Sequence, residues 1–415
     1  MAAAFESQKG ILHCEGCSLK QLARDIGTPL YVYSRNALVD NFRQFDRAFG
    51  EFPHLVCFAV KDTSNLSLLR LFRDLGAGFD IVSGGELFRA RQVGADPQKV
   101  VFSGVGKKNV EIDYALNSNI LLFNVESKAE LDAIEARGKT LNIKARVAIR
   151  VNPDIDPDTH PHIATGLLQH KFGIGVEEAL PLYRHAASLS FVEPVGVSCH
   201  IGSQVTTLNP FVEATQRVLK LVEELNASGI RLRYIDLGGG LGIRYRDECP
   251  PIVFDYAAAL TRLLAGRPET LILEPGRILA ADAAVLLTEV LYLKQSQGRQ
   301  FVVADAGMND LLRPGLYGAF HDIVPVEATE RDAVVADVVG PVWETTDYLA
   351  RDRSLPQVQS GEVLAVKDAG AYGFTLSSNY NSRPRAAEVL VDSQSYHVIR
   401  KRESYEDLVR GEKGF

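Results

Sequence analysis

The sequence predicts a closed (β/α)8 barrel joined to a mainly antiparallel β domain. Eight short apolar runs alternate with amphipathic helical segments between residues 55 and 287, as in a parallel sheet with crossover helices. Each run ends in a polar residue or a glycine turn, which is typical of strand ends that gather at the active face of a barrel. After residue 287, Val-rich segments of alternating polarity replace the helical pattern.

Composition limits the classes of function. The 415 residues are 46% hydrophobic and 23% charged, which is globular composition with enough length for two domains. The net charge of -7 argues against a broad nucleic-acid or anionic-membrane surface. The most apolar candidate helix, at 278–293, is interrupted by Asp282 and Glu289, so no membrane span is predicted. The N-terminus lacks a signal-peptide pattern, and we expect a cytoplasmic protein.

The five cysteines are sparse and odd in number, unlike a disulfide framework. Cys14 and Cys17 have the spacing of a metal-ligand pair, and His13 is adjacent to them. A tetrahedral zinc site needs a second ligand pair of similar spacing, and the sequence contains none. The sequence therefore predicts no metal site.

The barrel follows a short N-terminal region. A helix at 19–23 and a strand at 30–33 precede a helix at 37–49, in which apolar residues recur at helical spacing. The eight barrel strands are then predicted at 56–60, 78–82, 100–102, 120–123, 145–151, 193–199, 234–237 and 270–273. An open doubly wound sheet is the alternative. It requires a glycine-rich phosphate turn after the first strand, whereas Lys-Asp-Thr-Ser follows at 61–64.

The β domain is expected to combine residues 1–36 and 288–415, with the barrel occupying 37–287. The strand at 30–33 is expected to complete its sheet. The other strands are predicted at 289–294, 301–305, 334–339, 363–366, 387–391 and 395–400, before a helix at 405–409.

Lys61 closes the first barrel strand and is the central candidate for chemistry. Burial beside apolar residues favours the neutral amine, and a neutral amine is what Schiff-base chemistry on a carbonyl needs. The alternative is a strand-end lysine whose ammonium reaches water. The other strand ends favour the chemical role, because they add an imidazole, carboxylates and a glycine turn: Asp80, Ser103, Asn124, Arg150, His200, Gly238-Gly239-Gly240 and Glu274.

Several of these residues suit a flat, anionic cofactor. The glycines at 238–240 allow backbone N–H groups to approach an anion, and Ser203 could add a hydroxyl, although a plain tight turn is the alternative. Glu274 could face a ring nitrogen, or it could pair with Arg277. His200 could stack on the ring, or it could be a core histidine.

Two further segments suit an amino-acid substrate. Arg313 and Tyr317 bring a carboxylate-binding guanidinium close to a phenol. Tyr372 lies between small residues in the Gly-Ala-Tyr-Gly segment, where an aromatic ring can project freely. Arginines and turn tyrosines are common on protein surfaces, so the interpretation as a substrate site rests on the combination of these residues and not on any one of them.

Taken in order, these segments resemble the fold-type III decarboxylases that use pyridoxal 5'-phosphate, and within them most closely the diaminopimelate decarboxylase branch. The resemblance spans nearly the whole chain. The matching motifs are Phe-Ala-Val-Lys at 58–61, Asp-Ile-Val-Ser-Gly-Gly-Glu at 80–86, His-Lys-Phe-Gly at 170–173, Cys-His-Ile-Gly-Ser at 199–203, Gly-Gly-Gly at 238–240, Glu-Pro-Gly-Arg at 274–277, Asp-Ala-Gly-Met-Asn-Asp at 305–310, Gly-Pro-Val-Trp-Glu at 340–344, Gly-Ala-Tyr-Gly at 370–373 and Ser-Ser-Asn-Tyr-Asn-Ser-Arg-Pro at 377–384.

The resemblance implies a homodimeric enzyme that converts meso-2,6-diaminopimelate to L-lysine and CO2 in lysine biosynthesis. Lys61 would hold the cofactor covalently, His200 would stack on its ring and Glu274 would contact the pyridine nitrogen. Further cofactor contacts would come from Asp80, Ser203, Gly239, Gly240, Gly276, Arg277 and Tyr372. The substrate would be held by Arg277, Arg313, Tyr317, Tyr372 and Glu344 of the partner subunit, with Lys61, His200 and Glu344 as the catalytic residues.

The sequence departs from the family at Trp343. The family pattern there is Gly-Pro-x-Cys-Glu, and the cysteine is the expected proton donor, whereas an indole N–H has no useful acidity. Lys61, Tyr372 or water could supply the proton instead. Alternatively, Trp343 narrows the pocket for another amino acid with a polar far end, such as D-lysine, D-ornithine or a carboxy-polyamine. A third reading is a cofactor-binding pseudoenzyme that catalyses poorly.

Overall fold

The computed structural model describes residues 4–155 and 171–414, which form two compact units. One unit comprises Phe42–Arg244 and Glu248–Ile278, and it contains the barrel. The other comprises Met1–Asn41, Tyr245–Asp247 and Leu279–Phe415, and it contains a mainly antiparallel sheet. The domain boundaries given by the sequence, after residues 36 and 287, stay a prediction.

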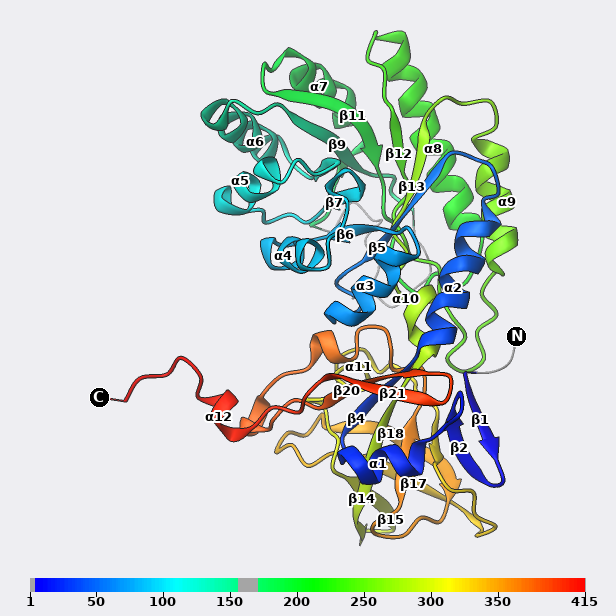
Figure 1. Cartoon of the computed structure of the whole chain (residues 1–415). Coiled ribbons are helices and arrows are strands. Elements are labelled where there is room, and N and C mark those ends of the chain that lie inside the picture. Colours follow the sequence, from blue (N-terminus) through cyan, green and yellow to red (C-terminus); the bar gives the residue numbers. More distant parts are fainter. Residues whose placement is uncertain (1–3, 156–170, 415) are drawn as a thin grey trace. The chain divides into compact units, whose positions relative to one another are not determined.

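Eight parallel strands close on themselves to form the barrel (Figure 1). Each barrel strand pairs with the next barrel strand in chain order, and the eighth pairs with the first. The strands are β5 His54–Ala59, β6 Gly78–Ile81, β7 Val100–Phe102, β8 Leu122–Val125, β9 Ala145–Asn152, β11 Val192–Ser198, β12 Tyr234–Asp236 and β13 Thr270–Leu273. A two-residue strand, β10 Ile174–Gly175, adds to β9. The closed barrel is confirmed, and the open-sheet alternative is wrong.

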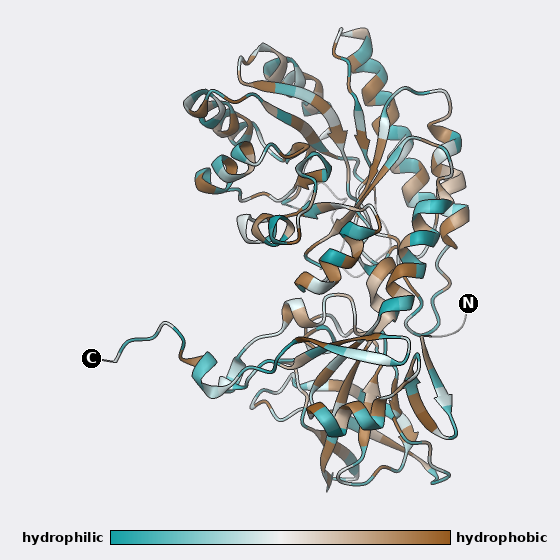
Figure 2. Ribbon diagram, in the orientation of Figure 1, coloured by the Kyte–Doolittle hydropathy of each residue, from teal (hydrophilic) through white to brown (hydrophobic). Residues whose placement is uncertain are grey.

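Helices follow the strands and cover the outside of the barrel. They are α3 Leu66–Asp74, α4 Gly84–Gln92, α5 Asn109–Asn117, α6 Lys128–Leu141, α7 Val176–Ser188, α8 Asn209–Ala227 and α9 Val253–Leu263, with a short 3-10 helix η1 at Pro97–Lys99. The side chains of Asn65, Ser83 and Ser127 cap the first turns of α3, α4 and α6. Apolar and polar residues alternate along these helices, as Figure 2 shows, so each buries one face.

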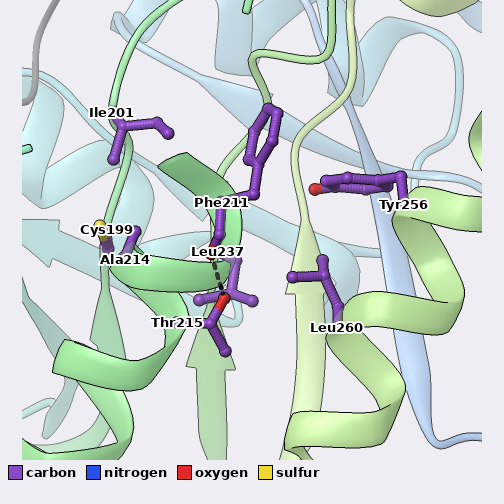
Figure 3. Close-up of a pocket in the computed structure, with 8 residues that line it drawn as sticks. All are labelled: Cys199, Ile201, Phe211, Ala214, Thr215, Leu237, Tyr256 and Leu260. Carbon is purple, nitrogen blue, oxygen red and sulfur yellow. Dashed lines mark hydrogen bonds between the residues drawn. The ribbon is translucent and has the colours of Figure 1, made fainter. Parts of the chain in front are cut away.

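The barrel core is built from aromatic and branched side chains. Phe58 of β5 stacks on Phe72 of α3 with ring centroids 4.0 Å apart, and both are fully buried. A small cavity lies between β11, β12, α8 and α9, and Figure 3 shows residues that line it, such as Leu237 and Leu260. Its volume is about 10 Å3. Thr215 already donates its hydroxyl to the carbonyl of Phe211 there, at 2.7 Å. The space suits about one water molecule at most, so it is a packing defect and no substrate site.

The sheet of the other unit has the strand order β18-β17-β15-β14-β4-β20-β21, with β19 paired to β14 and to β16. Its strands are β4 Leu30–Ser34, β14 Ala284–Ser296, β15 Arg299–Ala304, β16 Ile323–Pro325, β17 Ala333–Val339, β18 Tyr348–Pro356, β19 Val363–Val366, β20 Ala387–Asp392 and β21 Ser395–Arg400. The N-terminal strand β4 lies between β14 and β20, antiparallel to the first and parallel to the second. The prediction that an N-terminal strand completes this sheet is confirmed.

Shorter elements complete this unit. They are the strands β1 Phe5–Gln8, β2 Ile11–Cys14 and β3 Cys17–Ser18, the helices α1 Leu19–Ile26, α11 Arg313–Tyr317 and α12 Tyr405–Leu408, and the 3-10 turns η2 Ala281–Ala283, η3 Phe374–Leu376 and η4 Tyr380–Ser382. Two helices, α2 Arg35–Ala48 and α10 Arg277–Ala280, run from one unit into the other along the chain. No helix in the described part of the chain combines the length and apolarity needed to cross a membrane.

The structure corrects three sequence-based expectations. The helix expected at 278–293 is wrong, because only its start is helical and residues from Ala284 onward form β14, whose first half is buried between two neighbouring strands. Strand β18 was missed because three charged residues interrupt its apolar pattern. The strand expected at 120–123 lies two residues later, as β8, which brings Asn124 inside the barrel strand.

Cys14 and Cys17 face each other across the β2–β3 hairpin, and both are buried. All five cysteines are free thiols. Within residues 4–155 and 171–414, no group of three or more His, Cys, Asp and Glu side chains is arranged to hold a metal ion. The pair therefore packs as small hydrophobic residues at the turn.

Candidate active site

Lys61 lies in the turn that follows β5, at the carboxyl end of the barrel strands. Its ammonium forms an ion pair with Oδ2 of Asp80, whose side chain is fully buried in β6. The two backbones are held together as well, since the Val60 N–H donates to the carbonyl of Asp80 at 3.0 Å. Within the described residues, the second carboxylate oxygen of Asp80 is buried and meets no hydrogen-bond donor. A carboxylate in the barrel interior therefore holds the lysine at the mouth.

Glu274 follows β13 and shares a buried network with Asp236 and Asn124. The Asn124 amide donates to Asp236 Oδ2 at 2.9 Å, to Glu274 Oε1 at 3.3 Å and to Ser103 Oγ at 3.0 Å. Burial, and then the neighbouring carboxylates of Asp236 and Asp80, raises the pKa of Glu274 well above its usual range. Glu274 therefore keeps its proton and shares it with Asp236.

His200 follows β11 and is a neutral imidazole. Burial, with the positive charges of Arg150 and Lys61, lowers the pKa of His200 well below its usual range. The Gly239 N–H donates to His200 Nδ1 at 3.2 Å, so the ring proton lies on Nε2. Arg150, on β9, is itself held by the carboxylate of Glu126 at 3.1 Å.

The glycine turn after β12 allows the ends of three strands to meet. A Cβ on Gly239 would lie 2.2 Å from the carbonyl oxygen of Glu274. A Cβ on Gly240 would lie 2.4 Å from the carbonyl oxygen of Gly202, and its φ of 112° favours glycine as well. Beside this turn, the guanidinium of Arg277 donates to Ser203 Oγ at 2.9 Å, which puts two anion-binding groups in contact.

Arg313 and Tyr317 lie at the two ends of α11, in the other compact unit. The Arg313 side chain is buried, and its Nη1 lies 2.8 Å from His321 Nε2. Tyr372, in the same unit, has a positive φ of 55°, an uncommon conformation for an aromatic residue. Gly370, two residues before it, packs against the carbonyl of Ala280 with no room for a side chain, which fixes the path of this loop.

Trp343 and Glu344 lie on the loop between β17 and β18. Trp343 is 92% exposed, and Glu344 is also exposed. Two hydrogen bonds anchor the loop. The carboxylate of buried Asp347 accepts from the backbone N–H of Val342 at 2.6 Å, and the backbone N–H of Trp343 donates to Asn381 Oδ1 at 2.6 Å. The anchored loop backbone therefore holds the Trp343 indole and the Glu344 carboxylate at the surface.

The structure thus gathers the predicted cofactor residues of the barrel at one end of its strands. These are Lys61, Asp80, His200, Ser203, Gly239, Gly240, Glu274, Gly276 and Arg277. The predicted substrate residues Arg313, Tyr317, Glu344 and Tyr372, with Trp343, belong to the other unit. His170, part of one family motif, lies outside the described residues.

Sequence reasoning missed Asp236 and Asp347. Asp236 lies two residues before the glycine turn, and its position at a strand end was the available signal. Asp347 anchors its loop through backbone contacts that no sequence pattern marks. Three residues taken as strand-closing, Asp80, Asn124 and Arg150, lie inside their strands. Buried side chains inside the strands therefore support the site from below.

Comparison with known proteins agrees with this geometry. Residues 35–281 match the family model described as "Pyridoxal-dependent decarboxylase, pyridoxal binding domain". The chain is 50% identical to a diaminopimelate decarboxylase of Aquifex aeolicus over 406 residues, covering 98% of this chain and 96% of that protein. It superposes on a Helicobacter pylori diaminopimelate decarboxylase complexed with L-lysine with a TM-score of 0.91 at 45% identity, covering 94% and 98% of the two chains. For a diaminopimelate decarboxylase from "m. jannaschii", also in complex with L-lysine, the TM-score is 0.94 at 39% identity, covering 99% and 98% of the two chains. The chain therefore belongs to the diaminopimelate decarboxylase family of pyridoxal-dependent decarboxylases.

Proposed function

We propose that this chain removes CO2 from meso-2,6-diaminopimelate to give L-lysine, with pyridoxal 5'-phosphate as cofactor. The observation that carries the proposal is the set of groups at the mouth of the barrel. The Lys61 ammonium, a neutral imidazole, a protonated carboxyl and a hydroxyl–guanidinium pair follow the carboxyl ends of β5, β11 and β13. The family to which the chain belongs catalyses this class of reaction.

These groups match the chemical parts of pyridoxal phosphate. Lys61 would hold the aldehyde covalently, and Ser203 and Arg277, with the backbone of Gly239, Gly240 and Gly276, would hold the phosphate. Tyr372 is proposed as a further phosphate contact. When bound, the cofactor supplies an electron sink for the pair of electrons released as CO2 leaves.

Glu274 would face the ring nitrogen of the cofactor. Its raised pKa leaves a proton on the carboxyl group, and the hydrogen bond to Asp236 keeps that proton in place. Neutral His200 would lie against the ring without adding a positive charge to it. Asp80 orients the Lys61 amine from below through their ion pair.

The far end of the substrate carries a carboxylate and an ammonium group, which require opposite charges. Arg277, Arg313 and Tyr317 are proposed to bind the carboxylate, and Glu344 the ammonium. The carboxylate of Glu344 accepts from the N–H of Thr345 at 2.7 Å, which lowers its pKa and keeps it charged. Holding the far end by two charges fixes which stereocentre reacts.

We further propose a homodimer in which Glu344 reaches the active site of the partner. The support is the loop between β17 and β18, which is held by Asn381 and carries a 92% exposed indole, since large exposed aromatics are typical of interface anchors. Mixing the inactive Lys61→Ala and Glu344→Gln variants tests it. A shared site predicts that the mixture regains part of the activity, and no recovery would contradict sharing.

A cytoplasmic location is proposed from the five free cysteines, which fit a reducing compartment.

Trp343 is the observation that favours a second candidate, a related enzyme for D-lysine, D-ornithine or a carboxy-polyamine, or a protein that binds cofactor and catalyses poorly. Release of CO2 from a panel of these compounds, with meso-diaminopimelate, separates the candidates. The highest kcat/KM is expected for meso-diaminopimelate, and cofactor binding without release from any compound would identify a pseudoenzyme.

Cofactor binding is tested by absorbance. The purified protein, supplied with pyridoxal phosphate, is expected to be yellow, and Lys61→Ala is expected to remove the colour. Lys128→Ala, at an exposed lysine on α6, is the control and should retain it. Wild-type protein that stays colourless would remove the proposed function.

A further inference from the structure

His321 lies between Arg313 and the backbone of the sheet. Its Nε2 is 2.8 Å from Arg313 Nη1, and its Nδ1 is 2.8 Å from the carbonyl oxygen of Lys367. The imidazole is fully buried, and the Arg313 side chain is nearly so. Both ring nitrogens are therefore engaged, one by a guanidinium and one by a main-chain carbonyl.

These partners fix the tautomer of His321. The Lys367 carbonyl can only accept, so the proton lies on Nδ1 and donates to it. The Arg313 guanidinium can only donate, so Nε2 must present its lone pair. The ring is thus a neutral imidazole that accepts one N–H of Arg313 in a defined direction.

The support of this contact is rigid. The Lys367 N–H donates to the carbonyl of Asp322 at 2.8 Å, which continues the β16–β19 ladder, and Arg353 donates to the carbonyl of His321 at 2.7 Å. The ring of Tyr245 packs edge-on against the imidazole, with centroids 5.4 Å apart. The guanidinium carbon of Arg313 lies 4.7 Å from the centroid of the same tyrosine ring.

We propose that His321 is a positioning residue that sets the affinity for the substrate carboxylate far from the reacting carbon. Carboxylate recognition by arginine depends on the plane of the guanidinium, and one N–H fixed by His321 together with the Tyr245 ring determines that plane. The inference rests on the proposed function, in which Arg313 binds this carboxylate.

Two substitutions test the contacts of the two His321 ring nitrogens separately. In His321→Asn, the side-chain amide reaches the position of Nδ1, so the bond to Lys367 is kept and the acceptor for Arg313 is lost. In His321→Gln, the amide reaches the position of Nε2 and restores an acceptor for Arg313. Circular dichroism and the absorbance of the bound cofactor establish that each variant is folded and loaded.

The measurement is ligand affinity by calorimetry on the cofactor-loaded protein, with L-lysine and cadaverine as probes. L-lysine retains the distal carboxylate and cadaverine lacks it. His321→Asn is expected to weaken L-lysine about tenfold, as for one lost hydrogen bond to a charged group, and to leave cadaverine unchanged. His321→Gln is expected to recover most of the loss. For meso-diaminopimelate, KM should rise in His321→Asn with kcat little changed.

The Arg313→Gln variant shows whether the positioning role of His321 alone is wrong, or whether the carboxylate-binding role of Arg313 is wrong as well. If it weakens L-lysine and His321→Asn does not, the positioning role is overturned and the role of Arg313 stands. If Arg313→Gln leaves L-lysine binding intact, both roles are overturned. Equal losses for L-lysine and cadaverine, or equal losses in the Asn and Gln variants, would show a general structural effect and would also overturn the inference.

Discussion

Replacing Asp236 by asparagine is expected to flatten the dependence of barrel stability on pH. The substitution keeps the shape of the side chain and removes one of the buried carboxyl groups beside Glu274. Asp236 is fully buried, and it accepts from the Gly238 N–H and from the Asn124 amide, each at 2.9 Å. Asparagine has one acceptor oxygen for these donors, so the variant also loses some stability at every pH.

The magnitude follows from the pKa of Asp236. Burial raises this pKa from 3.8 to about 6, so the folded protein holds the proton more tightly than the unfolded chain does. The resulting stability is fully present below the unfolded value and is lost as the pH rises through the folded value. At about 1.4 kcal/mol for each pKa unit, the wild type loses about 3 kcal/mol over this window, and the variant does not.

The assay is urea unfolding of the cofactor-free protein from pH 4 to pH 7, followed by far-ultraviolet circular dichroism. The stability gap between wild type and Asp236→Asn should narrow by about 3 kcal/mol as the pH rises. Asp255→Asn, at an exposed position in the first turn of α9, is the control and should run parallel to the wild type. Parallel curves for Asp236→Asn and the wild type would refute the shared-proton network.

Three further outcomes are expected. Trp343→Cys should raise kcat with meso-diaminopimelate, because a thiol can donate a proton and an indole cannot; an unchanged rate would place the donor elsewhere. Phe58→Ala should lower the free energy of unfolding of the barrel by about 3 to 5 kcal/mol in urea titrations, because the ring is buried against Phe72; a loss below about 1 kcal/mol would contradict that packing. Asp347→Asn should lower the fluorescence anisotropy of Trp343, the single tryptophan, because the anchor at Val342 is weakened; unchanged anisotropy would mean that Asn381 suffices.

Strand ends were predictable because barrel strands and their polar termini are encoded locally. Lys61 and Glu274 could be selected from the residue that follows an apolar run, and the closed barrel then brings such residues to one face. Asp236 could not be ranked in this way, since its role depends on burial beside two other carboxyl groups. Nor could His321, whose partner Lys367 follows β19 and lies 46 residues later in the chain.

The incorrect prediction of a helix at 278–293 also arises because long-range contacts decide the structure. Residues 278–293 are mostly apolar, with Asp282 and Glu289 as the charged exceptions, and a largely apolar segment fits a buried strand as well as a buried helix. The first half of the segment is held as a strand by pairing with β4 and β19, and both partners lie far away in the sequence. Trp343 illustrates a different limit of sequence reasoning. The sequence shows that this residue departs from the family pattern, but it does not show that the side chain is exposed.

The position of β4 has a consequence for synthesis on the ribosome. This strand is translated before the barrel segment, whereas its neighbours β14 and β20 are translated after it (Figure 1). The barrel has all eight of its strands in one continuous stretch and is free to fold during translation, whereas β4 must wait with its apolar side chains uncovered. The nascent chain therefore leaves the edges of β4 unpaired until β14 and β20 have been made, and an unpaired strand edge is a site at which another chain can add.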